Sequence, residues 1–102
     1  MTKRWRAFHR KPLNNQLRRY RKKRHLSQRQ VAELIGHRQA GHVSAWEAGK
    51  RLPNLQSALK LSAAINCPIE VLFAPLFRAI RDPVILRRKT LESEGQITQS
   101  TL

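Results

Sequence analysis

The sequence is poor in acidic residues, has one cysteine and contains no long apolar run. Six Asp or Glu residues stand against 21 Lys or Arg in 102 residues, a formal charge of +15. A single cysteine excludes an intramolecular disulfide framework and any metal site built from cysteines alone, and it fits a reducing cytoplasm. The longest uncharged stretch that leans apolar, residues 61–69, is interrupted by Ser62, Asn66 and Pro68. A membrane-spanning helix needs about 20 consecutive apolar residues, so we expect a cytoplasmic protein with no membrane partner.

The scarcity of acids also argues against catalysis and metal binding. Asp82 is the only aspartate, and no carboxylate pair is placed for acid–base chemistry. His37 and His42 are five residues apart, which is not the i,i+4 spacing that puts two ligands on one helix face. No cysteine or acidic residue lies near them. The sequence therefore predicts no enzyme, no metal site and no cofactor.

The positive charge is concentrated in the first half of the chain. Residues 1–51 hold 15 basic and 2 acidic side chains, a net +13, whereas residues 52–102 hold 6 and 4, a net +2. A small chain this basic usually has a polyanionic partner, and nucleic acid is the default. The first half is the candidate binding half, and the second half is the candidate scaffold.

Local signals predict five short helices after a basic N-terminal arm, residues 1–13. Asn14 or Asn15 provides an N-cap for the first helix, and Ser27 with Gln30 forms a capping box for the second. Gly36 ends the second helix in the left-handed conformation. A third helix follows over about residues 40–48, with Val43 and Trp46 directed inward.

The fourth helix begins at Asn54 and is ended by Asn66, and the fifth runs from Pro68 to Phe73. The apolar stripe expected on the fourth helix is Leu55, Ala58, Leu59, Ser62 and Ile65. Beyond residue 75, residues 76–81 and 84–91 are two candidate helical segments divided by Asp82 and Pro83. Residues 92–102 contain no core residues, and we expect them to be disordered.

These elements predict an all-α protein in three parts. Residues 1–13 are the arm, residues 14–75 a five-helix domain, and residues 76–102 a C-terminal extension with a candidate dimerisation helix and a partly disordered tail. The apolar residues that would form the dimer surface, or else pack back onto the fifth helix, are Leu76, Phe77, Ile80, Val84, Ile85 and Leu86.

Two helices joined by a tight polar turn, with a basic helix before them, are the parts of a helix-turn-helix. Over residues 17–73 the sequence resembles the phage-repressor and Cro family, also called the XRE family. The positions that carry the resemblance are Leu26-Ser27-Gln28, Ala32, Gly36, Val43, Trp46-Glu47, Gly49, Arg51, Pro53, Leu55, Leu59, Leu61, Ala64 and Leu72-Phe73. The resemblance implies a lambda-repressor-like fold and a DNA-binding regulator.

Two departures from the family pattern concern the backbone. Gly36 to Val43 spans seven positions where the family has six, so one residue is added within residues 37–41. His25 stands where the family favours glycine, which asks a non-glycine residue to adopt a positive φ.

The resemblance also indicates which residues contact DNA. It implies base reading by Gln39 at the N-cap of the third helix, Ala40, Gly41, Ser44 and Ala45, with His42 as a further candidate. An amide such as that of Gln39 can bond adenine at two points. Phosphate contacts are implied for Gln28, at the start of the second helix, and the neighbouring cations Arg29, Arg38, Lys50 and Arg51 suit the same role. This reading surface is small, which is a third departure.

Arg21 is expected to face inward beside Leu17 and Tyr20, where a half-buried guanidinium needs an anion. The first 51 residues offer only Glu33 and Glu47, and Glu33 lies on the outer side of its helix. Glu47 is therefore the better partner, and the family resemblance implies the same pair.

The leading hypothesis is a sequence-specific regulator of transcription from a bacterium or mobile element, binding double-stranded DNA as a homodimer. Family members commonly bind two half-sites about one helical turn apart. One alternative is an antitoxin whose tail binds a toxin. A second candidate protein partner is the transcription machinery. A third alternative is a basic protein that binds nucleic acid, including RNA, without sequence preference.

Overall fold

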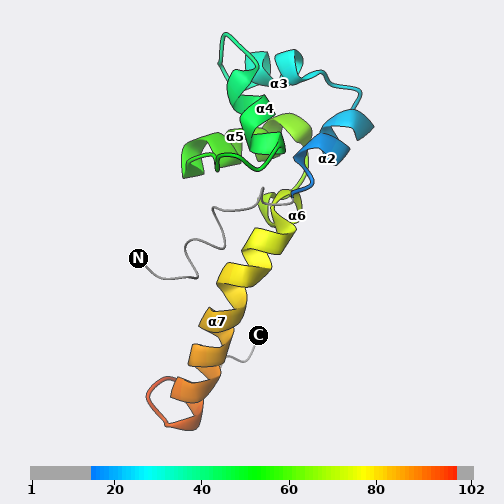
Figure 1. Ribbon diagram of the computed structural model, residues 1–102. Helices are drawn as coiled ribbons and strands as arrows, with labels where there is room; N and C mark the ends of the chain where they lie inside the picture. The colour runs from blue at the N-terminus through cyan, green and yellow to red at the C-terminus, as the bar shows by residue number, and fades with distance from the viewer. Residues whose placement is uncertain (1–14, 99–102) are drawn as a thin grey trace.

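A computed structural model describes residues 15–98, and these fold into six helices without a strand. The helices are α2 (Leu17–Lys23), α3 (Gln28–Leu34), α4 (Gly41–Glu47), α5 (Leu55–Ile65), α6 (Ile69–Leu72) and α7 (Ala74–Ser93). The first five pack into a bundle, and α7 projects away from it (Figure 1). The predicted all-α class is confirmed, with the five expected helices in the domain and a sixth in the extension. The arm, residues 1–13, and residues 99–102 lie outside the described part of the chain.

The beginnings of the helices follow local side-chain chemistry. The Ser27 hydroxyl accepts the N–H of Gln30, and the Gln30 side chain accepts the N–H of Ser27, which confirms the capping box. Asn54 accepts the N–H of Ser57 as expected. The first N-cap differs from the expectation, because Gln16 occupies that position. The Asn15 side chain still accepts the N–H of Leu17 at 3.1 Å.

Several helices end at a residue with positive φ. The residues are His25, Gly36, Gly49, Asn66 and Gly95. At His25 (φ 59°), the N–H of Leu26 donates to the Arg21 carbonyl and the N–H of His25 to the Lys22 carbonyl, which satisfies two carbonyls at the end of α2. The expected positive φ at His25 is confirmed, and so is the left-handed Asn66.

The core lies between α2, α3, α4, α5 and α6. Its buried side chains are Leu17, Val31, Ala32, Ile35, Val43, Trp46, Leu61, Ile65, Cys67, Leu72 and Phe73. Val43 and Trp46 are both buried, as predicted. Burial of each large apolar side chain contributes about 1.5–3 kcal/mol, so α4 keeps its inward face and the turn, residues 36–40, absorbs the added residue.

The apolar stripe predicted for α5 is confirmed at Ala58 and Ile65 and wrong at Leu55 and Leu59. The buried residues are Ala58, Leu61 and Ile65, while Leu55 and Leu59 are exposed. Residues 58, 61 and 65 follow an i, i+3, i+7 spacing, so they form a complete inward stripe without Leu55 and Leu59.

The C-terminal extension forms one helix, not two. Residues 82 and 83 are helical, and α7 continues through Pro83 to Ser93, so residues 92 and 93 are ordered where we expected disorder. Pro83 removes one helical hydrogen bond, but α7 has no buried residue, and water can serve the carbonyl that is left. None of the helices in the described part of the chain is both long and apolar enough to cross a membrane.

Candidate nucleic-acid interface

The reading surface is built on α4, which packs against α3 through Val43 and Trp46. Because these two residues face the core, the exposed side of α4 presents Gly41, His42 and Ser44, with Ala45 half-buried between them. Every predicted base-reading residue of α4 itself is therefore on one face.

The structure places the two residues before α4 differently from the prediction. The N-cap is Ala40, not Gln39, and no side chain caps the helix. Ala40 is half-buried and packs against the core, because the added residue in the turn delays the start of α4. Gln39 is exposed in the turn, one position before the N-cap.

A shallow hollow of about 450 Å³ gathers more than half of the predicted contact residues. It is lined by Gln39, Gly41, His42, Ala45, Lys50 and Arg51. The turn, α4 and the loop after α4 each contribute to it, so residues that are up to 12 positions apart in sequence form one surface. Lys50 and Arg51 bring two positive charges to its edge, where they suit phosphates beside a reading helix.

A smaller hollow of about 110 Å³ brings Gln28 and Ser44 together with Arg18, Glu47 and Ala48. The Gln28 amide donates to Glu47 Oε1 at 3.0 Å. Arg18 Nε lies 3.9 Å from the same oxygen, although its side chain is 68% exposed. Arg18 begins a run of basic residues, 18–24, in which six of seven side chains are Lys or Arg. Its place beside the recognition helix could not be predicted from the charge run.

The predicted ion pair between Arg21 and Glu47 is confirmed. Arg21 Nε donates to Oε2 at 2.5 Å and Nη2 to Oε1 at 3.1 Å, while Nη1 donates to the Leu26 carbonyl at 2.8 Å. Both side chains are more than nine-tenths buried. The pair holds the end of α4 against α2, directly behind the smaller hollow.

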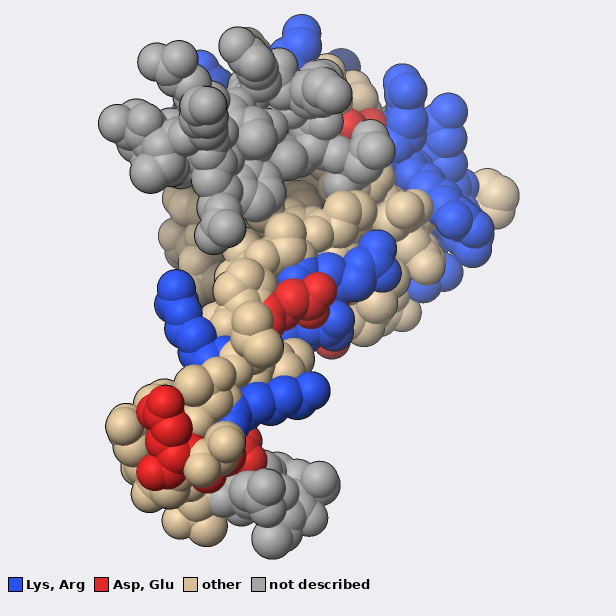
Figure 2. Space-filling model, turned by 60° about the horizontal axis from the view of Figure 1, so that its bottom comes forward, with Lys and Arg blue, Asp and Glu red and all other residues tan. Residues whose placement is uncertain are grey.

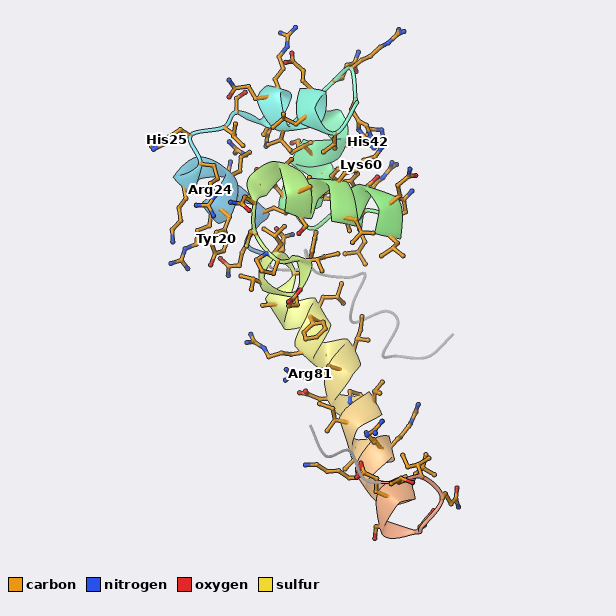
Figure 3. All side chains as sticks on the ribbon, turned by 180° about the vertical axis from the view of Figure 1, so that it is seen from behind. Tyr20, Arg24, His25, His42, Lys60 and Arg81 are labelled. Carbon is orange, nitrogen blue, oxygen red and sulfur yellow. The ribbon has the colours of Figure 1, made fainter. Side chains whose placement is uncertain are left out.

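The other basic side chains have two kinds of surroundings. Some bond to the protein backbone, and others are exposed to solvent. Arg24 donates from Nε to the Ile65 carbonyl and from Nη2 to the Asn66 carbonyl, each at 3.0 Å (Figure 3). Arg29 and Arg38 are exposed and line neither hollow. Lys and Arg side chains gather over the α2 side of the bundle, and both basic and acidic side chains appear along α7 (Figure 2).

An aromatic cluster that could not be predicted from the sequence connects His37 in the turn to His42 and Trp46 on α4. The rings of His37 and His42 are 5.3 Å apart in an edge arrangement, and Trp46 lies 5.8 Å from the first ring and 5.9 Å from the second. The cluster joins the lengthened turn to α4. Among the described residues, no group of three potential metal ligands comes together.

A seven-residue helix with one buried edge, preceded by a second helix and flanked by exposed cations, defines a helix-turn-helix DNA-binding protein. A family model described as Helix-turn-helix matches residues 17–72. The chain therefore belongs to this family of DNA-binding transcription regulators of the Cro and repressor type, the XRE family, and the predicted resemblance is confirmed. A search of curated proteins gives no match.

Proposed function

We propose that this regulator recognises a defined double-stranded DNA sequence by placing α4 in the major groove. The observation that carries the proposal is the hollow formed by the turn, α4 and the following loop. It puts the Gln39 amide and the His42 imidazole, which can bond base edges, beside Lys50 and Arg51, which suit phosphates. Ala45 and Gly41 are small, so the helix can approach the bases closely.

The smaller hollow supports a set of phosphate contacts that fixes the register of α4. Arg18 supplies a guanidinium, Ser44 a hydroxyl and Gln28 an amide, of which one N–H is already directed to Glu47. Such contacts set the orientation of a protein on the duplex without reading its sequence. Arg29 and Arg38, which are exposed, remain proposed phosphate contacts outside the two hollows.

We also propose that the chain acts as a homodimer on two half-sites, in a bacterium or mobile element as the family resemblance implies. The support is the exposed apolar surface of α7, which includes Phe77, Ile80, Val84, Ile85 and Leu86, with Leu76 half-buried. No residue of α7 is fully buried, and five of these six apolar side chains remain exposed.

Selection from random duplexes at near-physiological salt tests the proposal. We expect an enriched sequence bound at least about 10³-fold more tightly than a scrambled duplex. Gln39→Ala should relax the preference at one base pair, with a loss of about 1–3 kcal/mol on the selected sequence. Lys50→Ala is the control and should weaken binding to all sequences alike. Equal binding to selected and scrambled duplexes would contradict sequence recognition and leave a non-specific binder.

A further inference from the structure

Helix α7 carries a seam of regularly spaced side chains along its free length. Phe77, Ile80, Val84, Arg87 and Leu91 follow alternating steps of three and four residues, and Phe73 continues the pattern at the base of the helix. This 3.5-residue spacing is the a/d pattern by which one helix packs against another of the same kind. Ile85 and Leu86 lie outside it.

The base of α7 also forms one wall of an apolar groove of about 260 Å³. The loop before α5, the first turns of α5, α6 and the first turns of α7 all contribute to it, through Leu52, Leu55, Ile69, Phe73 and Phe77 among others. Glu70 is the single charged residue in the lining. The distal half of α7 carries the opposite charge, in the run Arg87-Arg88-Lys89.

The position of Arg87 in the seam decides how two such helices can pair. In a parallel pair, residues at the same position face each other, so Arg87 would oppose Arg87 of the second copy inside the seam. In an antiparallel pair centred near residue 82, a positions meet d positions. Ile80 then faces Val84 of the second copy, Arg87 faces Phe77, and Leu91 faces Phe73.

The antiparallel pairing places each charge beside a suitable group. A guanidinium over an aromatic ring is favourable, and the Phe77 ring already accepts one from its own chain, with Arg81 5.6 Å from its centroid. The same pairing carries the distal half of each α7 to the groove of the other copy, where Glu70 meets the basic run. Both the apolar surface and the charges thus favour a second copy as the occupant of the groove.

We propose that two copies of this chain pair through antiparallel α7 helices, with the distal half of each helix seated in the apolar groove of the other. This inference rests on the homodimer of the proposed function and specifies its architecture. An α7 of 20 residues is about 30 Å long. The two helix-turn-helix units therefore lie at opposite ends of the pair, at a separation comparable to the one-turn spacing of DNA half-sites.

Disulfide cross-linking of the full chain tests the orientation. Phe77→Cys and Arg87→Cys are prepared separately, then oxidised alone and as a mixture, and the linked peptides are mapped by mass spectrometry. The antiparallel pairing predicts a 77–87 disulfide in the mixture and no seam disulfide in either variant alone. Homodisulfides at 77 and at 87 in the single variants, or no seam disulfide in the mixture, would overturn the proposal. The wild-type chain, whose Cys67 is buried, is the control.

A matched pair of exposed substitutions tests the seam itself. Ile80→Glu and Ala79→Glu alter neighbouring exposed side chains of the same helix, so neither should unfold the bundle. We expect Ile80→Glu to raise the dimer dissociation constant about tenfold or more, because the carboxylate would be buried against Val84 of the second copy. Ala79→Glu adds the same charge outside the seam and should leave the constant unchanged, as measured by analytical ultracentrifugation. An equal effect of both, or none from Ile80→Glu, would refute the seam.

Neither measurement uses DNA, so their outcome is separate from that of the selection experiment. Loss of sequence recognition with an intact 77–87 disulfide would reject the proposed function alone. Sequence recognition without the disulfide would reject the antiparallel pair alone.

Discussion

Glu47 is the buried residue whose hydrogen bonds connect α2 and α3 to α4. Its carboxylate accepts hydrogen bonds from Arg21 and Gln28 and lies 3.9 Å from Arg18, although its side chain is only 4% exposed. A buried charge is tolerated when it is paired and hydrogen-bonded, and it becomes strongly destabilising when a partner is removed. Arg21 is buried beside Glu47, whereas Arg18 is exposed. Substituting each in turn therefore distinguishes the effect of a buried ion pair from that of a nearby positive charge.

We predict that Arg21→Ala lowers the free energy of unfolding by about 2–4 kcal/mol, because it leaves Glu47 buried without its main partner. Arg18→Ala removes the same charge from an exposed position and should lower it by less than about 1 kcal/mol. Urea denaturation of the two variants measures both values. Equal losses would show that burial of the pair does not matter.

The buried Cys67 thiol gives stability a dependence on alkaline pH. Burial raises the pKa of Cys67 above its ordinary value, with the charge of Arg24 acting weakly in the opposite sense. The unfolded chain therefore loses this proton first, and the thiol's contribution to stability is present below the unfolded pKa of about 8.5 and declines as pH rises above it. We expect a steeper loss of stability above that pH in the wild type than in Cys67→Ala, in urea titrations at several pH values. Parallel curves would contradict a raised pKa.

At the scale of the helices, left-handed residues determine where the elements end. His25 and Asn66 hold positive φ with a side chain attached, whereas Gly36, Gly49 and Gly95 do so without one. A left-handed conformation costs most residues about 1–2 kcal/mol, and asparagine is among the residues that tolerate it. His25 therefore makes the end of α2 less stable than a glycine at the same position would.

His25→Gly should raise the free energy of unfolding by about 0.5–1 kcal/mol, since the relief of backbone strain exceeds the added entropy of the unfolded chain. Asn66→Gly is the comparison and should give a smaller gain. Thermal or urea denaturation measures the difference. A larger gain in the free energy of unfolding from Asn66→Gly than from His25→Gly would show that backbone strain does not determine the size of the gain.

Pro83 is the weak point of α7. It lies within a helix that no tertiary burial supports, and proline costs an interior helical position about 3 kcal/mol relative to alanine. We predict that Pro83→Ala increases the helical circular dichroism signal and leaves the melting temperature of the bundle nearly unchanged. Lys89→Ala, at another exposed position of α7, should have little effect. An equal signal from both variants would contradict the prediction.

The elements that could be predicted from the sequence are those fixed by short-range chemistry. Ser27 with Gln30, Asn54 and Asn66 form bonds within a few residues, so their caps and ends follow from the sequence. The exposure of Leu55 and Leu59 was missed because it depends on which neighbours cover α5. Pro83 was expected to divide the extension, because proline is usually a helix breaker.

In the candidate site too, features fixed by short-range patterns could be predicted, and features that depend on neighbouring elements could not. Ser44 and Ala45 lie on one exposed face because helical periodicity places them there. The N-cap moved from Gln39 to Ala40 because an added residue in a turn has no periodicity to fix its position. The approach of Arg18 to Ser44 joins α2 to α4, and a charge run alone does not specify it.

At the scale of the whole molecule, α4 itself carries no Lys or Arg, whereas residues 18–24, in α2 and at its C-terminal end, carry six. Lys22 lies one helical turn after Arg18 and is exposed on α2. If it neutralises one phosphate, Lys22→Gln should reduce the slope of log affinity against log salt by about 0.9 without changing the preferred sequence. Lys89→Gln on α7 is the control and should leave the slope unchanged. Titrations at several salt concentrations on the selected duplex measure both slopes, and equal slopes for Lys22→Gln and wild type would exclude that contact.

The sharing of one carboxylate by three helices also has a consequence for motion. Arg21 of α2 and Gln28 of α3 both donate to Glu47 at the end of α4. If one of these three helices opened alone, the hydrogen bonds would break and leave a charged group without its partner. Native-state hydrogen exchange should therefore show α2, α3 and α4 opening together as one cooperative unit. The protein would then hold its DNA-reading surface as a single rigid block.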